Sequence, residues 1–337
     1  MRNSLFTLVL AVLAGGVSQA SSSFTFGKHD HNHTSHGEAC GIYPKHAADA
    51  EKHFQTNIGS HRAGKYNDDY LWAEIPINFH IIANNQTMLD FIESEGRIEA
   101  QFEMMQEAFA PARIEWKLTN ITRTINETWW ERMGEGLIEE DPDDLLEVNP
   151  IERQMKETLG SGNPAILEVF IVQLLQGPGL GGYVRALPAR FSDSPEHELE
   201  RDQIDGVVLN WNALPFNPNP QIRQVFQGKT LIHEVGHWMG LLHTFGHVSE
   251  GPGSCEGPGD YIDDTPVQAY ATHDDLRSTA TSIEDCVAQD SCPGLPGLDP
   301  VLNYMDYTPD VCRTEFTPGQ IWKMRMMLDM YRNIKAY

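Results

Sequence analysis

One stretch of eleven residues, HEVGHWMGLLH (233–243), combines the residue types and the spacing that a metal site needs. Residues four apart lie on the same face of an α-helix, so His233 and His237 can direct their imidazoles at one ion. His243 can join them only if the helix ends first. Gly240 would end it, because glycine adopts a left-handed conformation at no steric cost. Three neutral imidazoles leave one position of a tetrahedral zinc ion open, as in catalytic zinc sites.

Glu234 supplies the remaining group that hydrolysis at such a site requires. Zinc makes a bound water molecule more acidic, and a neighbouring carboxylate can take the water's proton and pass it to a departing amine. The pattern therefore predicts metal-assisted hydrolysis of a peptide bond with Glu234 as the general base. A buried helix with structural histidines is the alternative, and the simultaneous presence of Glu234 and Gly240 argues against it.

A second element, NYMDY (303–307), lies well downstream of His243. A methionine turn beneath the metal accompanies the extended histidine pattern in one clan of zinc enzymes. Met305 would place a polarisable thioether under the three imidazoles. Tyr307 could bring its hydroxyl to the metal or to the oxyanion that develops during hydrolysis. An aromatic turn alone more often only packs, so these assignments depend on the histidine pattern upstream.

The chain from Leu71 onward alternates strands and helices that would position these residues. Apolar residues alternate with others in 75–81, as in a strand, and recur with helical spacing in 91–109. Similar patterns predict strands at 113–118, 166–172 and 207–209, and helices at 151–159, from about Gly228, and at 320–333. This order predicts an α/β (α+β) fold in which a twisted, mostly parallel sheet carries the metal-binding helix. After His243 glycine, proline and aspartate dominate, which predicts an irregular C-terminal subdomain.

The N-terminal residues differ in composition from the rest. Residues 1–20 have the features of a secretory signal peptide, with Arg2 as the only charge, a mostly apolar stretch at 5–13 and an expected cleavage after Ala20. Residues 21–65 are polar and rich in histidine, and we interpret them as a solvated, disordered pro-segment or N-terminal extension. The catalytic domain would span 66–337, with an N-terminal subdomain to about 243 and a C-terminal subdomain over 244–337. The protein is predicted to be secreted and extracellular.

Charge and hydrophobicity limit the partners. The net charge of −24 argues against nucleic acid and anionic membrane, since both repel such a surface. No run of about eighteen apolar residues follows the signal, so no membrane span is predicted. A hydrophobic content of 40% supports a packed core. The hydrolytic pattern points to a polypeptide substrate.

The chain contains five cysteines, and in the oxidising compartment that a secreted protein enters, four of them are expected to form disulfides. Four of them lie in the C-terminal subdomain: Cys255, Cys286, Cys292 and Cys312. They predict two disulfides, although the spacing alone permits three pairings. Cys40 could be a latch whose thiolate occupies the open metal position until the N-terminal segment is removed, or a free or intermolecularly paired thiol. Sequons that mark candidate glycosylation sites occur at Asn32, Asn85, Asn120 and Asn126.

An acidic turn could hold a second metal. Asp260, Asp263, Asp264 and Thr265 supply hard oxygens of the kind that calcium prefers. Such an ion would help to pin the long irregular stretch after His243. An acidic turn without metal is the alternative, because the residues do not form a complete EF-hand loop.

The chain resembles the metzincin clan of zinc peptidases, and within it the pappalysin family, especially its secreted fungal members. The matching segments are GKTLIHEVGHWMGLLHTF (228–245), GDYIDDTP (259–266), NYMDY (303–307) and FTPGQIWKM (316–324), and DGVVLNWNALP (205–215) is similar to the family's edge strand.

The resemblance implies a metzincin-type catalytic domain and a secreted zinc endopeptidase. It implies that His233, His237 and His243 are the zinc ligands, that Glu234 is the base and that Tyr307 stabilises the transition state. It favours interlaced disulfides, Cys255 with Cys292 and Cys286 with Cys312. It also suggests a calcium site using Asp260, the Asp263 carbonyl and Thr265, and some family members have a cysteine latch comparable to Cys40.

Two other classes of function are compatible with the sequence. One is a catalytically silent secreted binding protein on the same fold, against which the intact Glu234 argues. The other is a zinc-dependent hydrolase of non-peptide substrates. In the endopeptidase hypothesis, an extended polypeptide would lie along an edge strand near 207–210, where main-chain hydrogen bonds would hold it.

Overall fold

The computed structural model describes residues 44–62, 71–135, 149–174, 180–185, 187–188, 203–245, 255–272 and 280–336. These residues all belong to one compact unit, 37–337. The predicted signal peptide (1–20), Asn32 and Cys40 lie outside them. No helix among the described residues is long and apolar enough to cross a membrane.

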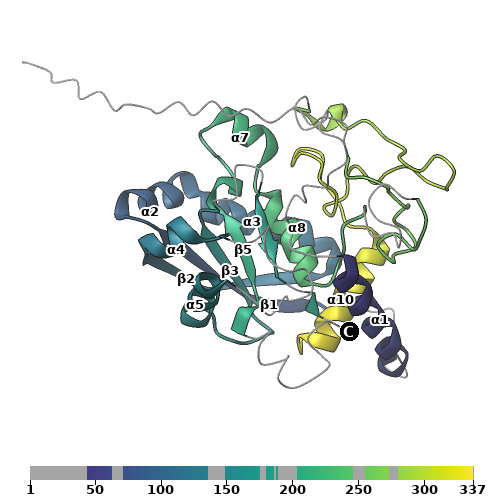
Figure 1. The fold of residues 1–337 in the computed structure, drawn as a ribbon, viewed down its shortest axis with the longest axis horizontal. Helices are drawn as coiled ribbons and strands as arrows, with labels where there is room; N and C mark the ends of the chain where they lie inside the picture. Colours follow the sequence, from purple (N-terminus) through teal and green to yellow (C-terminus); the bar gives the residue numbers. More distant parts are fainter. Residues whose placement is uncertain are drawn as a thin grey trace, which may run out of the picture. The chain divides into compact units, whose positions relative to one another are not determined.

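A five-stranded sheet forms the centre of the structure (Figure 1). Its strand order is β2-β1-β3-β5-β4. Its strands are β1 (Ala73–Ala83), β2 (Ile114–Ile125), β3 (Leu167–Val172), β4 (Gly182–Val184) and β5 (Val207–Asn210). β1 pairs in parallel with β2 and with β3, and β3 pairs in parallel with β5. β4 runs antiparallel to β5. Every residue of β3 and β5 is buried, which is why these strands read as unbroken apolar runs. The predicted α/β class with a mostly parallel sheet is confirmed.

The strand near 207–210 is not the edge of the sheet, which corrects the sequence-based placement. β5 lies between β3 and β4, and β4 is the last strand on that side. The pairing of β4 joins Gly182 to Leu209 and Val184 to Val207. A three-residue strand that begins with glycine is too short to show an alternating pattern, so hydrophobic periodicity does not predict it.

The helix expected over 91–109 is broken in two. α2 (Gln86–Glu93) and α3 (Arg97–Phe109) are separated by a 3₁₀ turn (Ser94–Gly96). Glu95 and Gly96 have φ values of 63° and 65°, which no α-helix accommodates. The Arg97 guanidinium donates to the Ser94 carbonyl (3.2 Å) and hydroxyl (2.7 Å), which stabilises the break. Apolar residues keep helical spacing on both sides of the break, so hydrophobic periodicity alone predicts one continuous helix.

Five further helices follow along the described part of the chain, and one of them, α8, carries the first part of the histidine pattern. They are α4 (Glu127–Arg132), α5 (Pro150–Leu159), α7 (Pro220–Val225), α8 (Lys229–Trp238) and α10 (Pro318–Tyr331). α8 packs against β4, β5 and α3. Between α8 and α10 the described chain is irregular apart from a 3₁₀ turn at Ile283–Asp285. The predicted irregular C-terminal region is therefore present.

Two disulfides link this irregular region. Cys255 is bonded to Cys292 and Cys286 to Cys312, with Cα–Cα distances of 5.6 and 5.7 Å. This is the interlaced arrangement. A bridge that closes a loop stabilises the fold mainly by restricting the unfolded chain, which suits a segment with little regular structure.

The N-terminal segment contains a helix that the sequence interpretation did not anticipate. Residues Pro44–Arg62 form α1, although 21–65 were expected to be solvated and disordered. Ala50, Phe54 and Ile58 are buried and lie four residues apart, so they form one apolar stripe on an otherwise polar helix. This stripe packs in a cluster with Leu242, Met326 and Met327. Because the segment is polar on average, its composition did not predict that one face of this helix is buried.

Candidate metal centre

The start of α8 is fixed by a carboxylate. Asp310 is fully buried, and its Oδ2 accepts hydrogen bonds from the backbone N–H groups of Gln227 (2.6 Å) and Lys229 (2.8 Å). A carboxylate at this position satisfies one of the unpaired N–H groups of the first turn, that of Lys229, and complements the helix dipole. Asp310 was not among the predicted site residues, because it lies far from α8 in the sequence.

The end of α8 is fixed by Gly240. The helix ends at Trp238, and Gly240 follows with a φ of 85°. A Cβ at this position would lie 2.7 Å from Met327 Cγ of α10, so packing as well as backbone conformation requires glycine. The turn sends the chain back toward the helix and brings His243 alongside His233 and His237, as the spacing predicted.

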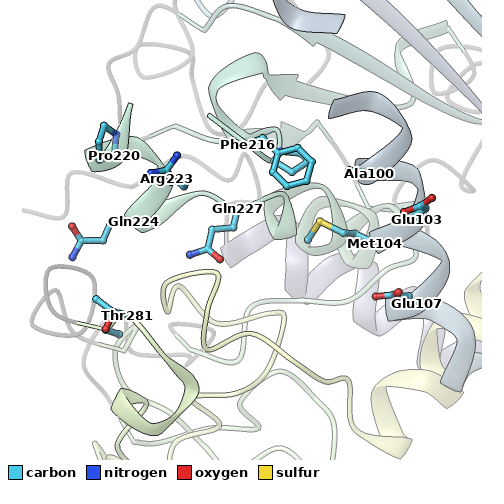
Figure 2. A pocket seen from close by; sticks show the side chains of 12 residues that line it. Ala100, Glu103, Met104, Glu107, Phe216, Pro220, Arg223, Gln224, Gln227 and Thr281 are labelled. Carbon is cyan, nitrogen blue, oxygen red and sulfur yellow. The ribbon is translucent and has the colours of Figure 1, made fainter. Parts of the chain in front are cut away.

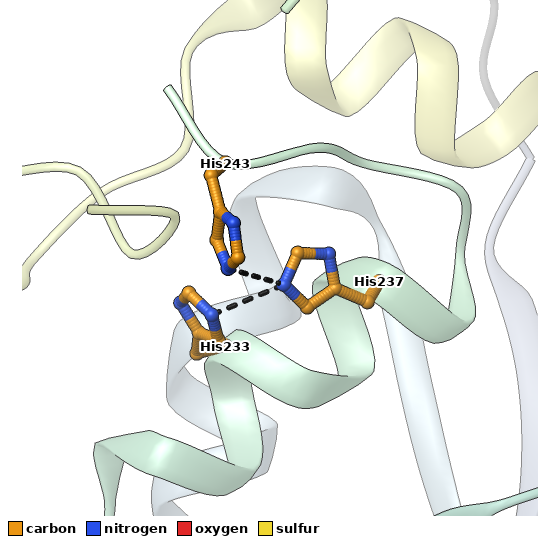
Figure 3. A group of neighbouring side chains, drawn as sticks. All are labelled: His233, His237 and His243. Carbon is orange, nitrogen blue, oxygen red and sulfur yellow. Dashed lines mark hydrogen bonds between the residues drawn. The ribbon is translucent and has the colours of Figure 1, made fainter. Parts of the chain in front are cut away.

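The three histidines converge in the structure, as Figure 3 shows. The Nε2 atom of His237 lies 3.1 Å from Nε2 of His233 and 3.1 Å from Nε2 of His243. All three side chains are buried. Among the described residues, no other group of three or more His, Cys, Asp or Glu side chains converges in this way.

The hydrogen-bond partners of the imidazoles show that the site fits a cation. His233 Nδ1 lies 2.7 Å from the Tyr304 carbonyl, and His237 Nδ1 lies 2.7 Å from the Leu241 carbonyl. A carbonyl only accepts, so both Nδ1 atoms carry the hydrogen and both Nε2 atoms present lone pairs. Lone pairs that face one another with no hydrogen between them match a site for a positive ion.

Burial favours the neutral form of His233 and His237. It lowers the pKa of His237 to about 4, and burial together with the nearby His237 and Arg313 charges lowers that of His233 well below its ordinary value. Neutral imidazole is the form that binds a metal ion. Imidazole nitrogen donors suit zinc, whereas calcium and magnesium require oxygen ligands.

The NYMDY turn lies against this trio. The ring of Tyr307 has its centroid 4.8 Å from that of His243 and 5.6 Å from that of His233. Met305 is fully buried in contact with α8. Phe245 stacks on His243 at 4.9 Å with the rings almost parallel, and its ring also meets that of Tyr307 edge-on at 4.8 Å. The structure therefore brings both residues of the predicted turn to the three histidines.

A buried amide pair holds the turn in place. The Asn303 and Gln320 side chains exchange two hydrogen bonds, of 2.7 and 3.0 Å, and Asn303 Oδ1 also accepts from the Met305 N–H at 2.9 Å. Gln320 belongs to the first turn of α10. α10 thereby positions the turn under the histidines, a role that the spacing of Gln320 in the sequence does not reveal.

Glu234 lies between the histidines and the edge strand. Its side chain is buried, and a Cβ added to Gly182 of β4 would lie 3.1 Å from Glu234 Cγ. Glycine at 182 therefore leaves the space that this carboxylate occupies. α8 contacts β4 directly, so the edge strand and the carboxylate are held together.

The acidic turn is only partly assembled into a cation site. Asp260 is buried, and its Oδ1 accepts from the Thr265 hydroxyl at 2.5 Å, whereas its Oδ2 has no hydrogen-bond partner among the described residues. Burial raises the pKa of Asp260 to about 7. Asp263 lies exposed in the same turn. An orphaned, buried carboxylate oxygen next to a threonine hydroxyl fits a hard cation such as calcium.

Asp264 has a different role from the one that its oxygens suggested. Its carboxylate accepts from the Thr317 hydroxyl at 2.7 Å and from the Gly319 N–H at 2.8 Å. Both groups lie at the start of α10, so Asp264 caps that helix.

Of the described sequons, Asn85 and Asn120 are exposed and Asn126 is half-buried.

A separate cavity of about 810 Å³ lies between α3 and α7 (Figure 2). Glu103 and Met104 of α3, Phe216, Gln227 and Thr281 are among its lining residues. None of the three histidines, Glu234 or Tyr307 lines it. The cavity is thus distinct from the metal centre.

Comparison with known proteins agrees with this geometry. The family model of peptidase M43, described as Pregnancy-associated plasma protein-A, matches residues 166–329. An extracellular metalloprotease of Pyricularia oryzae is 34% identical over 254 residues, which cover 75% of this chain and 74% of the relative. Extracellular metalloproteases of Colletotrichum graminicola (31% identical; 77% of each chain) and Coccidioides posadasii (32%; 80% of this chain and 82% of the relative) are also similar.

The matched family segment begins just before β3 and includes α8, the NYMDY turn and most of α10. The similarity to the fungal relatives extends over most of both chains. Together with the three-histidine cluster on a mostly parallel sheet, this shows that the chain belongs to the pappalysin (peptidase M43) family of metalloproteases.

Proposed function

We propose that the protein is a secreted zinc endopeptidase in which His233, His237 and His243 hold one zinc ion. The observation that supports this most directly is the convergence of the three Nε2 atoms while two of the Nδ1 atoms are held by carbonyls. Zinc bound there would acidify a water molecule and polarise the carbonyl of the substrate.

Glu234 is the proposed general base. Its buried carboxylate, held beneath β4, would accept a proton from the attacking water and transfer it to the departing amine. Tyr307 would donate a hydrogen bond from its hydroxyl to the oxyanion of the substrate, because its ring already lies against His243 and His233.

The edge strand β4 is the proposed docking site for substrate. An extended polypeptide could add to the outer side of β4 and pair with its main chain. This pairing would place the scissile bond above Glu234, whose side chain lies under Gly182. The proposal moves the substrate from β5, where sequence reasoning placed it, to its neighbour.

Two further assignments belong to the same proposal. Secretion is supported by the names of the fungal relatives, which are extracellular metalloproteases. Calcium binding at Asp260, the Asp263 carbonyl and Thr265 is supported by the orphaned oxygen of Asp260. Both extend beyond the family assignment itself.

Proteolysis of unfolded casein by the purified protein tests the function. We expect cleavage that stops with 1,10-phenanthroline and returns when zinc is added. Absence of cleavage from a sample that contains stoichiometric zinc would favour a binding protein or a hydrolase of other substrates. Cleavage that persists after the zinc has been removed would contradict the role of the three histidines.

A further inference from the structure

Helix α1 covers an apolar surface next to the metal centre. Its buried residues Ala50, Phe54 and Ile58 pack with Met326 and Met327 of α10. Phe54 has no exposed surface, and its ring meets that of Trp322 edge-on at a centroid distance of 6.2 Å. Figure 1 shows α1 lying against α10. Without α1, the part of α10 that carries Met326 and Met327 would lose this apolar cover.

A buried ion pair joins the same two helices. Lys323 of α10 donates to Glu51 of α1 at 2.7 Å, and the two side chains are only 3% and 4% exposed. Lys323 also lies 5.9 Å from the centre of the Phe54 ring. Removing one partner of a buried pair leaves an uncompensated charge, which is strongly destabilising. A chain without Glu51 would therefore lose the partner of Lys323 as well as the apolar cover.

The cluster around α1 reaches the segments that form the metal centre. Leu242 packs in it and directly precedes His243. Leu187 packs in it and follows β4, the proposed substrate strand. Tyr261 packs against it and directly follows Asp260. α1 thus supports, from one side, the histidine loop, the exit of the edge strand and the acidic turn.

We propose that α1 is a permanent part of the catalytic domain, that any maturation cleavage falls N-terminal to Ala50, and that α1 supports the loop that carries His243. The expected domain boundary near residue 65 would then move upstream of Ala50, so that the buried face of α1 belongs to the catalytic domain. A cleavage on that side could still remove Cys40 from the chain. α1 would be retained whether or not the protein hydrolyses peptides, so the two proposals fail separately.

The mass and the N-terminal sequence of the active, secreted protein, expressed from the full-length chain, test the position of the cleavage. We expect the first residue to lie before Ala50, so that Glu51 and Phe54 remain in the same chain as His243. An active enzyme whose first residue lies beyond Ala50 would overturn the proposal. The same measurement on the inactive Glu234→Gln variant distinguishes self-cleavage from processing by another peptidase and leaves the expected boundary unchanged.

Substitutions in the full-length chain test the support of the histidine loop. Phe54→Ala should lower the melting temperature by roughly 10 °C, since truncation of a buried phenylalanine is among the most destabilising changes. It should also speed the loss of zinc to a chelator several-fold at a temperature where the protein remains folded. Lys52→Ala, on the exposed side of α1, is the matched control and should change neither quantity.

A double-substitution cycle tests the ion pair. Glu51→Gln alone should lower the melting temperature more than it does in a Lys323→Gln background, because the second change removes the unpaired cation. Equal effects in both backgrounds would contradict a direct interaction between the two residues. A Phe54→Ala protein with unchanged stability would overturn the role of α1 in the fold, and one with unchanged zinc release would overturn its support of His243.

Discussion

The sulfur of Met305 lies directly against Gly236 of α8. A Cβ on Gly236 would overlap Met305 Sδ and would lie 3.2 Å from its Cε. Gly236 falls between Glu234 and His237, so the methionine turn contacts the helix at the centre of the proposed site. The absence of a side chain at 236 therefore sets the distance between the turn that carries Tyr307 and the helix that carries the histidines.

Gly236→Ala should destabilise the protein although alanine is the better helix former. Alanine is favoured over glycine in a helix interior by about 1 kcal/mol, whereas overpacking a core costs about 1–3 kcal/mol. We expect a net loss of roughly 1 kcal/mol in the free energy of unfolding and weaker zinc binding, both measured by urea titration with and without chelator.

Gly294→Ala is the control for this change, since a Cβ there would meet no atom within 4 Å. Its stability should stay within about 0.5 kcal/mol of the original protein, the usual range for surface substitutions. A Gly236→Ala protein that is more stable than the original would show that Met305 moves away freely.

Glu234→Gln should remove catalysis and leave the metal site intact. The amide cannot accept a proton, and general-base catalysis contributes roughly 10²–10⁴-fold to rate. We expect kcat to fall by at least that factor while the zinc content stays at one ion per chain, measured by inductively coupled plasma mass spectrometry. Glu103→Gln on the exposed face of α3 is the control and should retain full activity. Comparable turnover by the two variants would refute the role of Glu234.

Acid should loosen the edge strand through Glu152. Burial raises the pKa of Glu152, but the charges of Lys156 and Arg185 outweigh burial and lower the pKa to about 2. Tyr183 of β4 also donates to this carboxylate at 2.8 Å, and Arg185, just after β4, donates to it at 2.7 Å. Because the pKa is lower in the folded state, the stabilisation is complete above the unfolded value of 4.5 and is lost as the pH falls toward 2.

The linkage amounts to about 3 kcal/mol over that range. The free energy of unfolding of the Glu234→Gln protein, which cannot digest itself, should be measured from pH 6 to pH 2. Tyr183→Phe removes one donor to Glu152 and should shift the acid transition toward higher pH. Tyr183→Phe is therefore made in the Glu234→Gln protein, and the acid transitions of the single and the double variant are compared. Identical transitions would show that Glu152 does not hold β4.

Calcium and protons should compete at Asp260. Burial raises the pKa of Asp260 to about 7, so the folded protein favours its neutral form more than the unfolded chain does. Without a cation, stability should therefore increase as the pH falls from about 7 toward the unfolded value of 3.8. A bound calcium ion would compensate the charged form instead.

We expect calcium to raise the melting temperature by several degrees at pH 8 and by much less at pH 5, as measured by scanning calorimetry. Asp260→Asn should abolish the calcium effect and reduce the pH dependence around neutrality. Equal stabilisation by calcium at both pH values would contradict a site at this carboxylate.

The residues of the metal centre were predictable because their spacing follows helical geometry within a few residues. His233 and His237 are one helical turn apart, and Gly240 provides the return that His243 needs. The supporting residues were not predictable in this way. Asp310, Asn303 and Gln320 act across long sequence separations, through contacts that only the fold creates.

The errors in the fold have a similar cause. The break at Glu95 and Gly96 interrupts a helix whose apolar spacing continues on both sides. β4 is too short to show alternation, and its position outside β5 depends on the order of strands in the sheet. α1 is polar on average, and only the packing of Phe54 against α10 shows that one of its faces is buried.

Anomalous diffraction at the zinc absorption edge, on crystals of the secreted protein, tests the central proposal most directly. We predict one zinc ion per chain, bound by Nε2 of His233, His237 and His243 at about 2.0–2.1 Å, with the carboxylate of Glu234 outside the coordination sphere. Zinc bound elsewhere, or His243 directed away from the other two imidazoles, would contradict it.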